Sequence, residues 1–410
     1  MAVVLIGTLD TKGRELAFAR DLIRAQGLET LVVDAGSLGP PTIEPDVSRA
    51  DLFRLAGLEP PAQGDRGEAV AASAEAVARV VAAWHASGRV EGVFALGGSA
   101  GTVIGTSAMR GLPFGIPKVM VSTLASGQVG PFVRGSDIAM FHPVADLAGL
   151  NRLTRTALGH AAHALAGMVN APRPTGPAGK PRPVIAATMF GVTTPCIERA
   201  REVLEARGFE VLVFHATGSG GRSMEGLIRD GQVDAVLDLT TTELADELVG
   251  GILSAGPDRL TAASRRGVPQ VVSVGALDMV NFGPRETVPD RFAGRLFHQH
   301  NDSVTLMRTT AEENDRIGRR IGVALATSTA DVVVMLPLGG VSALDAPGMP
   351  FHDPEADAAL FAAIHEALDD VPNVTVVDRP YHINDPTFAL QAALALQLLL
   401  PHDPETTGPS

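Results

Sequence analysis

The second half of this sequence repeats features of the first half, and this repeat is the strongest constraint on the fold. At an offset of 181 residues and without gaps, eight positions of residues 19–35 carry the same residue type in residues 200–216. Two further pairs of segments follow in the same order, 90–94 with 233–237 and 115–120 with 267–272. Three matches in one order predict duplicated domains. The alternative is two unrelated domains that share glycine-ended helices and valine-rich strands, and either origin gives two α/β domains.

Each half begins with the pattern of a strand, a helix and a second strand. In the first half, the apolar run 3–6 precedes apolar residues at helical spacing in 15–24. Gly27 ends that helix, and a second apolar run follows at 31–33 and ends in Asp34. Continuous apolar strands joined by a helix are typical of buried parallel sheets. We therefore predict an α/β chain of two Rossmann-like, doubly wound parallel-sheet domains.

A segment rich in proline and glycine separates the two halves. Residues 171–183 (APRPTGPAGKPRP) hold five prolines and two glycines and no large apolar side chain. This composition indicates a linker. The predicted domains are residues 1–170 and 184–410. The second domain is the larger because it adds apolar runs at 332–336 and 374–377, a helix after Pro354 and a terminal helix at 386–400.

Charge and cysteine content exclude several classes of protein. The 46 acidic and 33 basic residues give a net charge of −13, which argues against a nucleic-acid partner. The one cysteine, Cys196, cannot form an internal disulfide, and Asp10 stands where a signal peptide would continue its apolar run. No uninterrupted apolar run is long enough to cross a membrane. We predict a cytoplasmic protein without a membrane partner, and the missing signal peptide disfavours a periplasmic two-lobed binder.

Polar loops follow the strands of the first domain. In open parallel sheets, ligands bind at the carboxyl ends of the strands, where helix N-termini offer free N–H groups. One loop supplies hydroxyls, a carboxylate and a lysine, a second is rich in glycine, and a carboxylate ends the second strand, where nucleotide-binding sheets often contact ribose. The residues predicted to bind a nucleotide are Gly7, Thr8, Asp10, Thr11, Lys12, Asp34, Gly97, Gly98, Ser99, Gly101, Thr102, Ser122 and Thr123.

The two common phosphate-binding motifs are absent from the sequence. The only Gly-Lys pair, Gly179-Lys180, lies in the linker and precedes a proline, so no P-loop exists, and no complete G-x-G-x-x-G follows a first strand. A nucleotide would therefore need a less common cradle. The structural alternative for residues 97–102 is a tight turn packed on the sheet.

Four segments carry a resemblance to a known family: 7–12 (GTLDTK), 95–102 (ALGGSAGT), 215–225 (HATGSGGRSME) and 337–345 (PLGGVSALD). Over essentially its whole length, the chain resembles an uncharacterised bacterial protein family that is similar to the ATP-binding N-terminal domain of a plant tobamovirus-resistance protein. The resemblance implies two Rossmann-like subdomains, ATP with its accompanying Mg²⁺ in the first, and a homodimer. It names no reaction for the bacterial proteins, and the antiviral role is not transferred.

The second domain carries titratable residues in loops that follow its strands. The residues predicted to carry chemistry there are His215, Arg222, Glu243, Asp278 and His300. In this hypothesis Arg222, at the start of a glycine-rich helix, binds a carboxylate or phosphate, and a histidine moves a proton. A glycine-rich turn with a solvated arginine is the alternative. His298 and His300 have the H-x-H spacing of metal ligands, but no third ligand lies at a fixed spacing, so we predict no metal.

Two further segments contain polar or reactive residues to which the sequence assigns no definite role. The long predicted loop after residue 338 offers Ser342, Asp345 and Asp353 as polar candidates. Cys196 stands near a predicted helix start, where a small buried residue is the favoured interpretation.

Taken together, these features favour an ATP-binding enzyme that acts on an anionic small molecule at the second domain or at an interdomain cleft. The alternative is a non-catalytic, nucleotide-dependent sensor or scaffold that binds a protein partner. The polar residues predicted in the second domain favour the enzyme, because a sensor needs only one occupied site.

Overall fold

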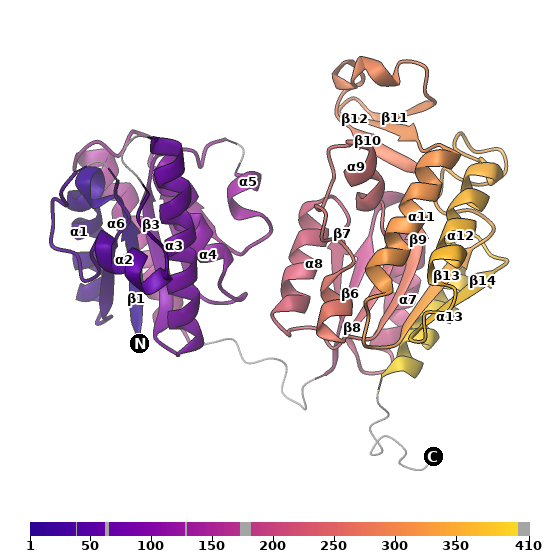
Figure 1. Cartoon of the computed structure of the whole chain (residues 1–410), viewed down its shortest axis with the longest axis horizontal. Helices are drawn as coiled ribbons and strands as arrows, with labels where there is room; N and C mark the ends of the chain where they lie inside the picture. The colour runs from indigo at the N-terminus through magenta and orange to yellow at the C-terminus, as the bar shows by residue number, and fades with distance from the viewer. Residues whose placement is uncertain (38, 62–64, 128, 173–181, 401–410) are drawn as a thin grey trace, which may run out of the picture. The chain divides into compact units, whose positions relative to one another are not determined.

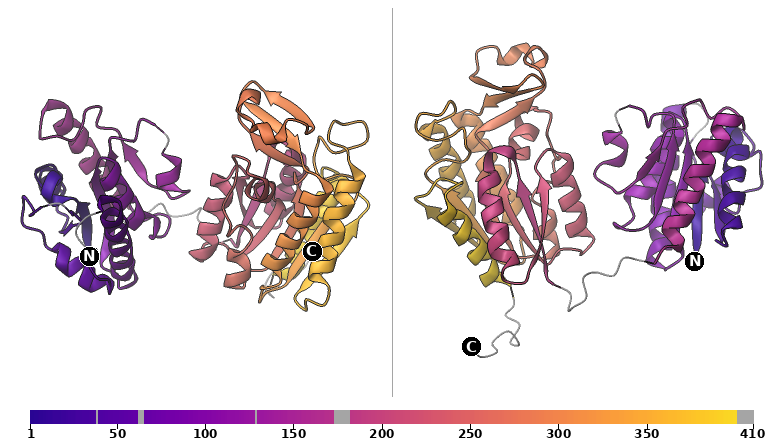
Figure 2. Two further views of the ribbon diagram at one scale, coloured as in Figure 1. Left: turned by 45° about the horizontal axis from the view of Figure 1, so that its top comes forward. Right: turned by 180° about the vertical axis from the view of Figure 1, so that it is seen from behind.

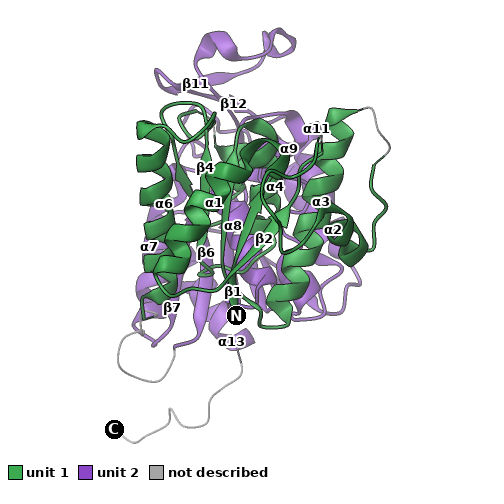
Figure 3. Ribbon diagram, turned by 90° about the vertical axis from the view of Figure 1, so that its left-hand side faces the viewer, with its two compact units in different colours: residues 1–177 green, residues 178–410 purple. Residues whose placement is uncertain are grey.

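The computed structural model of the chain describes residues 1–37, 39–61, 65–127, 129–172 and 182–400. The chain divides into two compact units, Met1–Pro177 and Ala178–Ser410, which Figure 3 shows in different colours. Most of the predicted linker, residues 173–181, lies outside the described residues. Each unit is described separately below.

Unit 1 is built on a parallel five-stranded sheet. Its strands are β1 (Ala2–Gly7), β2 (Thr30–Asp34), β3 (Val90–Gly97), β4 (Lys118–Ser122) and β5 (Ala139–Phe141). Their order in the sheet is β2-β1-β3-β4-β5, and every pairing is parallel. The first strand therefore lies inside the sheet, as its continuous apolar sequence predicts.

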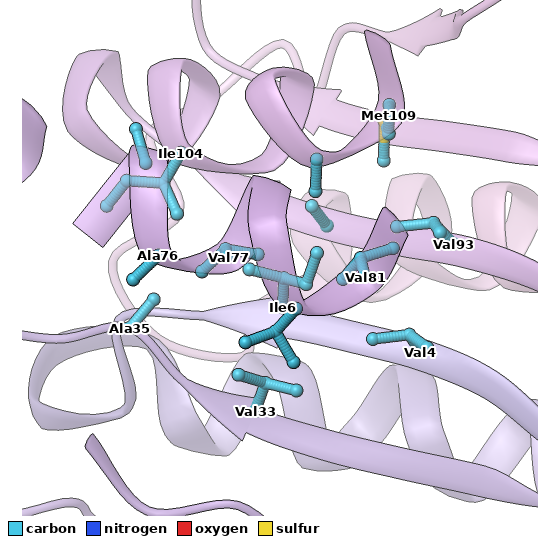
Figure 4. Packing of buried hydrophobic residues seen from close by; sticks show 14 of the residues in the cluster. Val4, Ile6, Val33, Ala35, Ala76, Val77, Val81, Val93, Ile104 and Met109 are labelled. Atoms are coloured by element: carbon cyan, nitrogen blue, oxygen red, sulfur yellow. The ribbon is translucent and has the colours of Figure 1, made fainter. Parts of the chain in front are cut away.

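Helices cover both faces of this sheet. They are α1 (Leu9–Ala25), α2 (Arg49–Ala56), α3 (Arg66–Ala86), α4 (Ser99–Arg110), α5 (Gly130–Val133) and α6 (Arg152–Asn170). Successive residues of β1 point to opposite faces, so Leu5 joins the core under α1 and α6, whereas Val4 and Ile6 join the core under α3 and α4. Figure 4 shows Val4 and Ile6 against Val77 and Val81 of α3.

Unit 2 contains a parallel six-stranded sheet. Its strands are β6 (Val184–Met189), β7 (Glu210–His215), β8 (Ala235–Thr240), β9 (Gln270–Gly275), β13 (Val332–Pro337) and β14 (Val374–Arg379), in the order β14-β13-β9-β8-β6-β7. Its helices are α7 (Thr194–Glu205), α8 (Ser219–Arg229), α9 (Glu243–Val249), α10 (Ala262–Arg266), α11 (Ala311–Leu325), α12 (Pro354–Leu368) and α13 (Pro386–Leu399). α7 and α13 pack together on one face, and α11 and α12 pack together on the other.

A small antiparallel sheet follows β9. It consists of β10 (Met279–Phe282), β11 (Phe297–Asn301) and β12 (Val304–Arg308), in the order β10-β12-β11. Three short 3₁₀ turns, Gly191–Thr193, Arg285–Thr287 and Asp290–Phe292, complete the unit. Figures 1 and 2 show the small sheet projecting from one end of unit 2. The H-x-H pair noted in the sequence, His298 and His300, lies within strand β11.

The two large sheets have matching strand orders. In each unit the first strand lies between the second and the third, and the fourth follows the third: β2-β1-β3-β4 in unit 1 and β7-β6-β8-β9 in unit 2. The segments that correspond at an offset of 181 residues, β2 and β7, occupy the same place in their sheets. The prediction of two parallel-sheet α/β domains, the second larger, is confirmed. Among the described residues, no helix is long and apolar enough to span a membrane.

Candidate functional site

A cavity of about 240 Å³ lies in unit 1 where β1 and β3 end. Its lining residues are Thr8, Asp10, Thr11, Lys12, Ala35, Ser37, Arg66, Val70, Ser73, Gly98, Ser99, Ala100, Gly101, Ile104 and Asp146. The predicted loops after β1 and β3 therefore meet at one site. Carboxyl ends of neighbouring parallel strands lie at the same edge of a sheet, which is why residues some 90 positions apart line one cavity.

Three helices begin at this cavity. α1 starts at Leu9, α3 at Arg66 and α4 at Ser99, and residues of the first turn of each helix line the cavity. The first N–H groups of a helix lack intrahelical partners and carry the positive end of its dipole. Asp65 accepts from the N–H groups of Gly67 and Glu68 at the start of α3, and Asp34 accepts from the N–H of Leu9 at the start of α1. The start of α4 has no side-chain cap, so its first N–H groups are the donors that favour an anion in this cavity.

The glycines of the β3–α4 loop have two different roles. A Cβ atom on Gly97 would lie 2.8 Å from the Cα of Gly101, and one on Gly101 would lie 2.9 Å from the carbonyl oxygen of Leu96. These two glycines therefore permit the tight turn that the structural alternative proposed. A Cβ on Gly98 would meet only Thr123 Oγ1, at 3.7 Å. Gly98 is thus not required by packing, and it faces the cavity.

Charged side chains of both signs line the cavity. Lys12 Nζ donates a 2.5 Å hydrogen bond to the carbonyl oxygen of Leu147, and Arg66 at the start of α3 is exposed. Asp10 Oδ2 accepts from the N–H of Gly39 at 3.2 Å, and Asp146 supplies the second carboxylate. Cations of this kind suit a phosphate, and carboxylates suit the hydrated cation that accompanies a polyphosphate.

Several residues that the sequence predicts to bind a nucleotide do not line the cavity. Asp34 is 2% exposed, and its Oδ1 accepts hydrogen bonds from the N–H groups of Leu9 and Gly36. Thr102 Oγ1 donates to the carbonyl oxygen of Gly98 and lies 2.6 Å from Ser122 Oγ. These side chains fix the start of α1 and the glycine loop. Gly7, Gly97 and Thr123 also lie outside the lining, and the N–H of Thr123 donates to the carbonyl oxygen of Gly97.

The structure adds lining residues that the sequence interpretation missed. Arg66, Val70 and Ser73 come from α3, and Asp146 comes from the loop after β5. The capping aspartate before Arg66 signals a helix start in the sequence, but only the folded sheet places that start beside α1 and α4. Asp146 carries no comparable signal.

In unit 2, Glu243 belongs to a buried network around Arg259. Its Oε1 accepts from the N–H groups of Gly218 and Gly221, and Arg259 Nε donates to its Oε2 at 2.7 Å. Arg259 also pairs with Asp238 and Glu225. The N-terminus of α8, where the sequence predicts a ligand, therefore already binds a carboxylate of the protein itself.

Three other predicted residues of unit 2 have separate surroundings. Arg222 Nη1 donates to the carbonyl oxygen of Ser254 at 2.6 Å. His215 is exposed at the end of β7, with its ring 5.6 Å from that of Phe190. His300 is exposed on β11. Among the described residues, no hydrogen bond or ion pair joins the side chains of these three residues to one another or to Glu243.

Asp278 lies in a second buried cluster. Ser342 Oγ donates to its Oδ2 at 2.7 Å, while its Oδ1 has no hydrogen-bond partner among the described residues. Burial raises the pKa of Asp278 to about 7, an effect that Arg308 opposes and Asp345 reinforces. The sequence interpretation had selected Asp278, Ser342 and Asp345 separately, and the structure brings them together. The described residues contain no group of three or more His, Cys, Asp or Glu side chains that could hold a metal.

Two models of one protein family match this chain. Residues 1–174 match the N-terminal domain, and residues 182–400 the C-terminal domain, of the uncharacterised protein family UPF0261. The chain belongs to the UPF0261 family. It is 48% identical over 397 residues to the UPF0261 protein of Clostridium tetani, which covers 96% of this chain and 98% of that protein.

A plant protein shares the same region. The chain is 40% identical over 410 residues to the ToMV resistance protein Tm-1(GCR237) of Solanum lycopersicum, covering 94% of this chain and 54% of the tomato protein. Among solved structures, a putative UDP-N-acetylglucosamine 2-epimerase from Listeria monocytogenes is 14% identical with a TM-score of 0.22, covering 92% of this chain and 100% of that chain. That structural likeness is too weak to inform on the ligand of this UPF0261 member.

Proposed function

We propose that unit 1 binds ATP, with its accompanying Mg²⁺, at the cavity between the starts of α1, α3 and α4. The observation that carries the proposal is that the uncapped start of α4 lines the same cavity as Lys12 and Arg66. The family resemblance described above, which implies ATP, supports the choice of nucleotide.

The cavity suits the polyphosphate end of the nucleotide. First-turn N–H groups of α4 would approach the phosphates where Gly98 leaves space, and Lys12 would leave the carbonyl oxygen of Leu147 to contact them. Asp10 and Asp146 would face the hydrated Mg²⁺. A volume of about 240 Å³ is below the roughly 300–1,000 Å³ of most ligand pockets, so we expect the base to remain partly outside the cavity.

The first prediction concerns Gly98. In Gly98→Val, the branched side chain would occupy the space that a phosphate needs, so we expect the dissociation constant for Mg²⁺–ATP to rise at least tenfold in isothermal titration, equivalent to about 1.4 kcal/mol. Gly167→Val in α6 is the matched control, because a Cβ at Gly167 meets nothing within 4 Å and Gly167 does not line the cavity. Unchanged ATP affinity in folded Gly98→Val protein would contradict the placement.

Two uses of the bound nucleotide are compatible with the structure. In the first, ATP serves an enzyme that acts on an anionic small molecule held by unit 2. In the second, the protein is a nucleotide-dependent sensor or scaffold. The second is favoured by one observation: Glu243 is engaged by backbone N–H groups and Arg259, while His215 and His300 are exposed and have other surroundings.

The second prediction separates these two functions. We expect a sensor to bind Mg²⁺–ATP without releasing phosphate when a panel of small carboxylates and phosphate esters is added. A phosphate-release assay on the full chain, with the Gly98→Val protein as the blank, measures this directly. Phosphate release that depends on one added compound and is lost in the Gly98→Val protein would establish the enzyme instead.

A further inference from the structure

The loop after β13 covers the carboxyl edge of the second sheet and is held there by a buried cluster of charges. Three carboxylates belong to it: Asp278 before β10, Asp345 in the loop, and Asp357 in α12. The single cation among them is Arg308 at the end of β12, which is 4% exposed. Three carboxylates around one guanidinium cannot all be ionised in a buried site without a large electrostatic cost.

The contacts show how the cluster holds the loop. Arg308 Nη2 donates to Asp357 Oδ1 at 2.8 Å and lies 3.9 Å from Asp345 Oδ1, while its Nε donates to the carbonyl oxygen of Phe351 at 2.8 Å. Ser342 Oγ donates to Asp278 Oδ2 at 2.7 Å. The loop therefore has one attachment through Ser342 and another through Phe351, and both end on members of the cluster.

The loop also folds on itself beside these attachments. Asp345 Oδ2 accepts from the N–H of Val341 at 2.8 Å, and the N–H of Phe351 donates to the carbonyl oxygen of Leu344. The N–H of Ala343 donates to the carbonyl oxygen of Val192 across the end of β6. These amide hydrogens are protected only while the loop is closed, so they report its opening.

We propose that residues 341–353 form a proton-controlled latch, which stays closed over the carboxyl edge of the second sheet while the cluster holds protons and loosens when they leave. In the protonated cluster, one ionised carboxylate balances Arg308. When all three carboxylates ionise, the buried site carries two uncompensated negative charges. Two histidines also face the cluster and its loop: His352 Nδ1 lies 3.8 Å from Asp345 Oδ1, and His382 Nε2 lies 2.9 Å from the carbonyl oxygen of Ser342.

The direction of the pH effect follows from proton binding in the two states. Burial raises the pKa of Asp278 to about 7, and burial together with Asp345 raises the pKa of Asp357. In the open loop both carboxyls would return toward the ordinary aspartate pKa near 3.9. Between the ordinary aspartate pKa and these raised values, about 7 for Asp278 and about 8 for Asp357, the closed state binds more protons than the open state. The latch therefore weakens as pH rises toward about 8 and changes little at higher pH.

Hydrogen exchange on the full chain tests the latch. Protection factors, which are the exchange rates of unstructured peptides divided by the observed rates at the same pH, are compared between pH 5 and pH 8 for the amides of Ala343 and Phe351. The third prediction is that the protection factors of these two loop amides fall at least tenfold from pH 5 to pH 8, whereas that of Val272 in β9 shows no matching fall. A loop that keeps its protection within twofold, or a fall that is equal at Val272, would overturn the proposal.

Amide isosteres identify the groups that hold the protons. Asp278→Asn combined with Asp357→Asn keeps the size of both side chains and removes their charge, so we expect the fall in loop protection to shrink to less than threefold. Asp302→Asn is the matched control, because Asp302 is exposed in the turn between β11 and β12. If the loop protection of the double variant still falls at least tenfold, Asp278 and Asp357 are not the groups that hold the protons, and the assignment is overturned. If that variant does not fold, the wild-type profile still decides between latch and no latch.

Discussion

Buried carboxylates in unit 2 outnumber the cations beside them. Arg259 is 2% exposed and faces Glu225, Asp238 and Glu243, all of them buried. Burial raises the pKa of Glu225, although Arg259 and two backbone N–H groups oppose that shift. A single guanidinium therefore holds together β8, α8 and the start of α9. We infer that a residue predicted from the sequence to be catalytic, such as Glu243, can have a structural role instead.

The fourth prediction tests this structural role. Arg259→Met would leave three buried carboxylates without their cation, which we expect to lower the free energy of unfolding of unit 2 by about 3–5 kcal/mol in urea at pH 7. The loss should be smaller at pH 5, because the carboxylates can take up protons there. Arg265→Met is the control, since that side chain is 64% exposed and pairs with an exposed aspartate, so we expect a change below about 1 kcal/mol. Equal losses in the two variants would contradict a structural network.

At the scale of the element, strands and helices were predictable because burial makes their patterns strong. Strands such as β1 and β6 are buried on both faces and read as continuous apolar runs, and the repeat at an offset of 181 residues indicates matching strand positions. The loops after β1 and β3 were predictable as site elements, because every parallel strand delivers its following loop to one edge. In unit 1 this reasoning placed Lys12 and Gly98 correctly in one cavity.

Other features could not be predicted from the sequence, and the reasons are physical. β11 has a polar sequence because it is the edge strand of the small sheet and its residues Gln299, His300 and Asn301 are exposed, so no apolar alternation marks it. The start of α8 looks like an anion site, but the carboxylate that fills it comes from Glu243, 25 residues from Gly218 along the chain. Asp34 shows the same limit in unit 1, since its backbone partners become visible only in the fold. The spacing of residues along the sequence does not reveal which side chain or backbone group hydrogen-bonds to a given polar group in the fold.

At the scale of the whole molecule, each unit has its own apolar core and its own fluorescent reporter. The core residues of unit 1 cluster around β1 and β3, and those of unit 2 around β6, β9 and β13. The single tryptophan, Trp84, is buried in α3 of unit 1, and the single tyrosine, Tyr381, lies in unit 2 after β14. Unfolding of the two units can therefore be followed separately in the intact chain.

The fifth prediction uses this separation to locate the nucleotide. A ligand that binds only the folded form of unit 1, at 100 times its dissociation constant, stabilises that unit by about 2.7 kcal/mol. With a urea dependence of about 1–3 kcal/mol per molar, the unfolding midpoint reported by Trp84 should rise by roughly 1 M or more, while the midpoint reported by Tyr381 stays within error. Gly98→Val protein should lose the shift at the same ATP concentration. A shift confined to Tyr381, or one that survives in the Gly98→Val protein, would place the nucleotide somewhere other than the cavity at the starts of α1, α3 and α4.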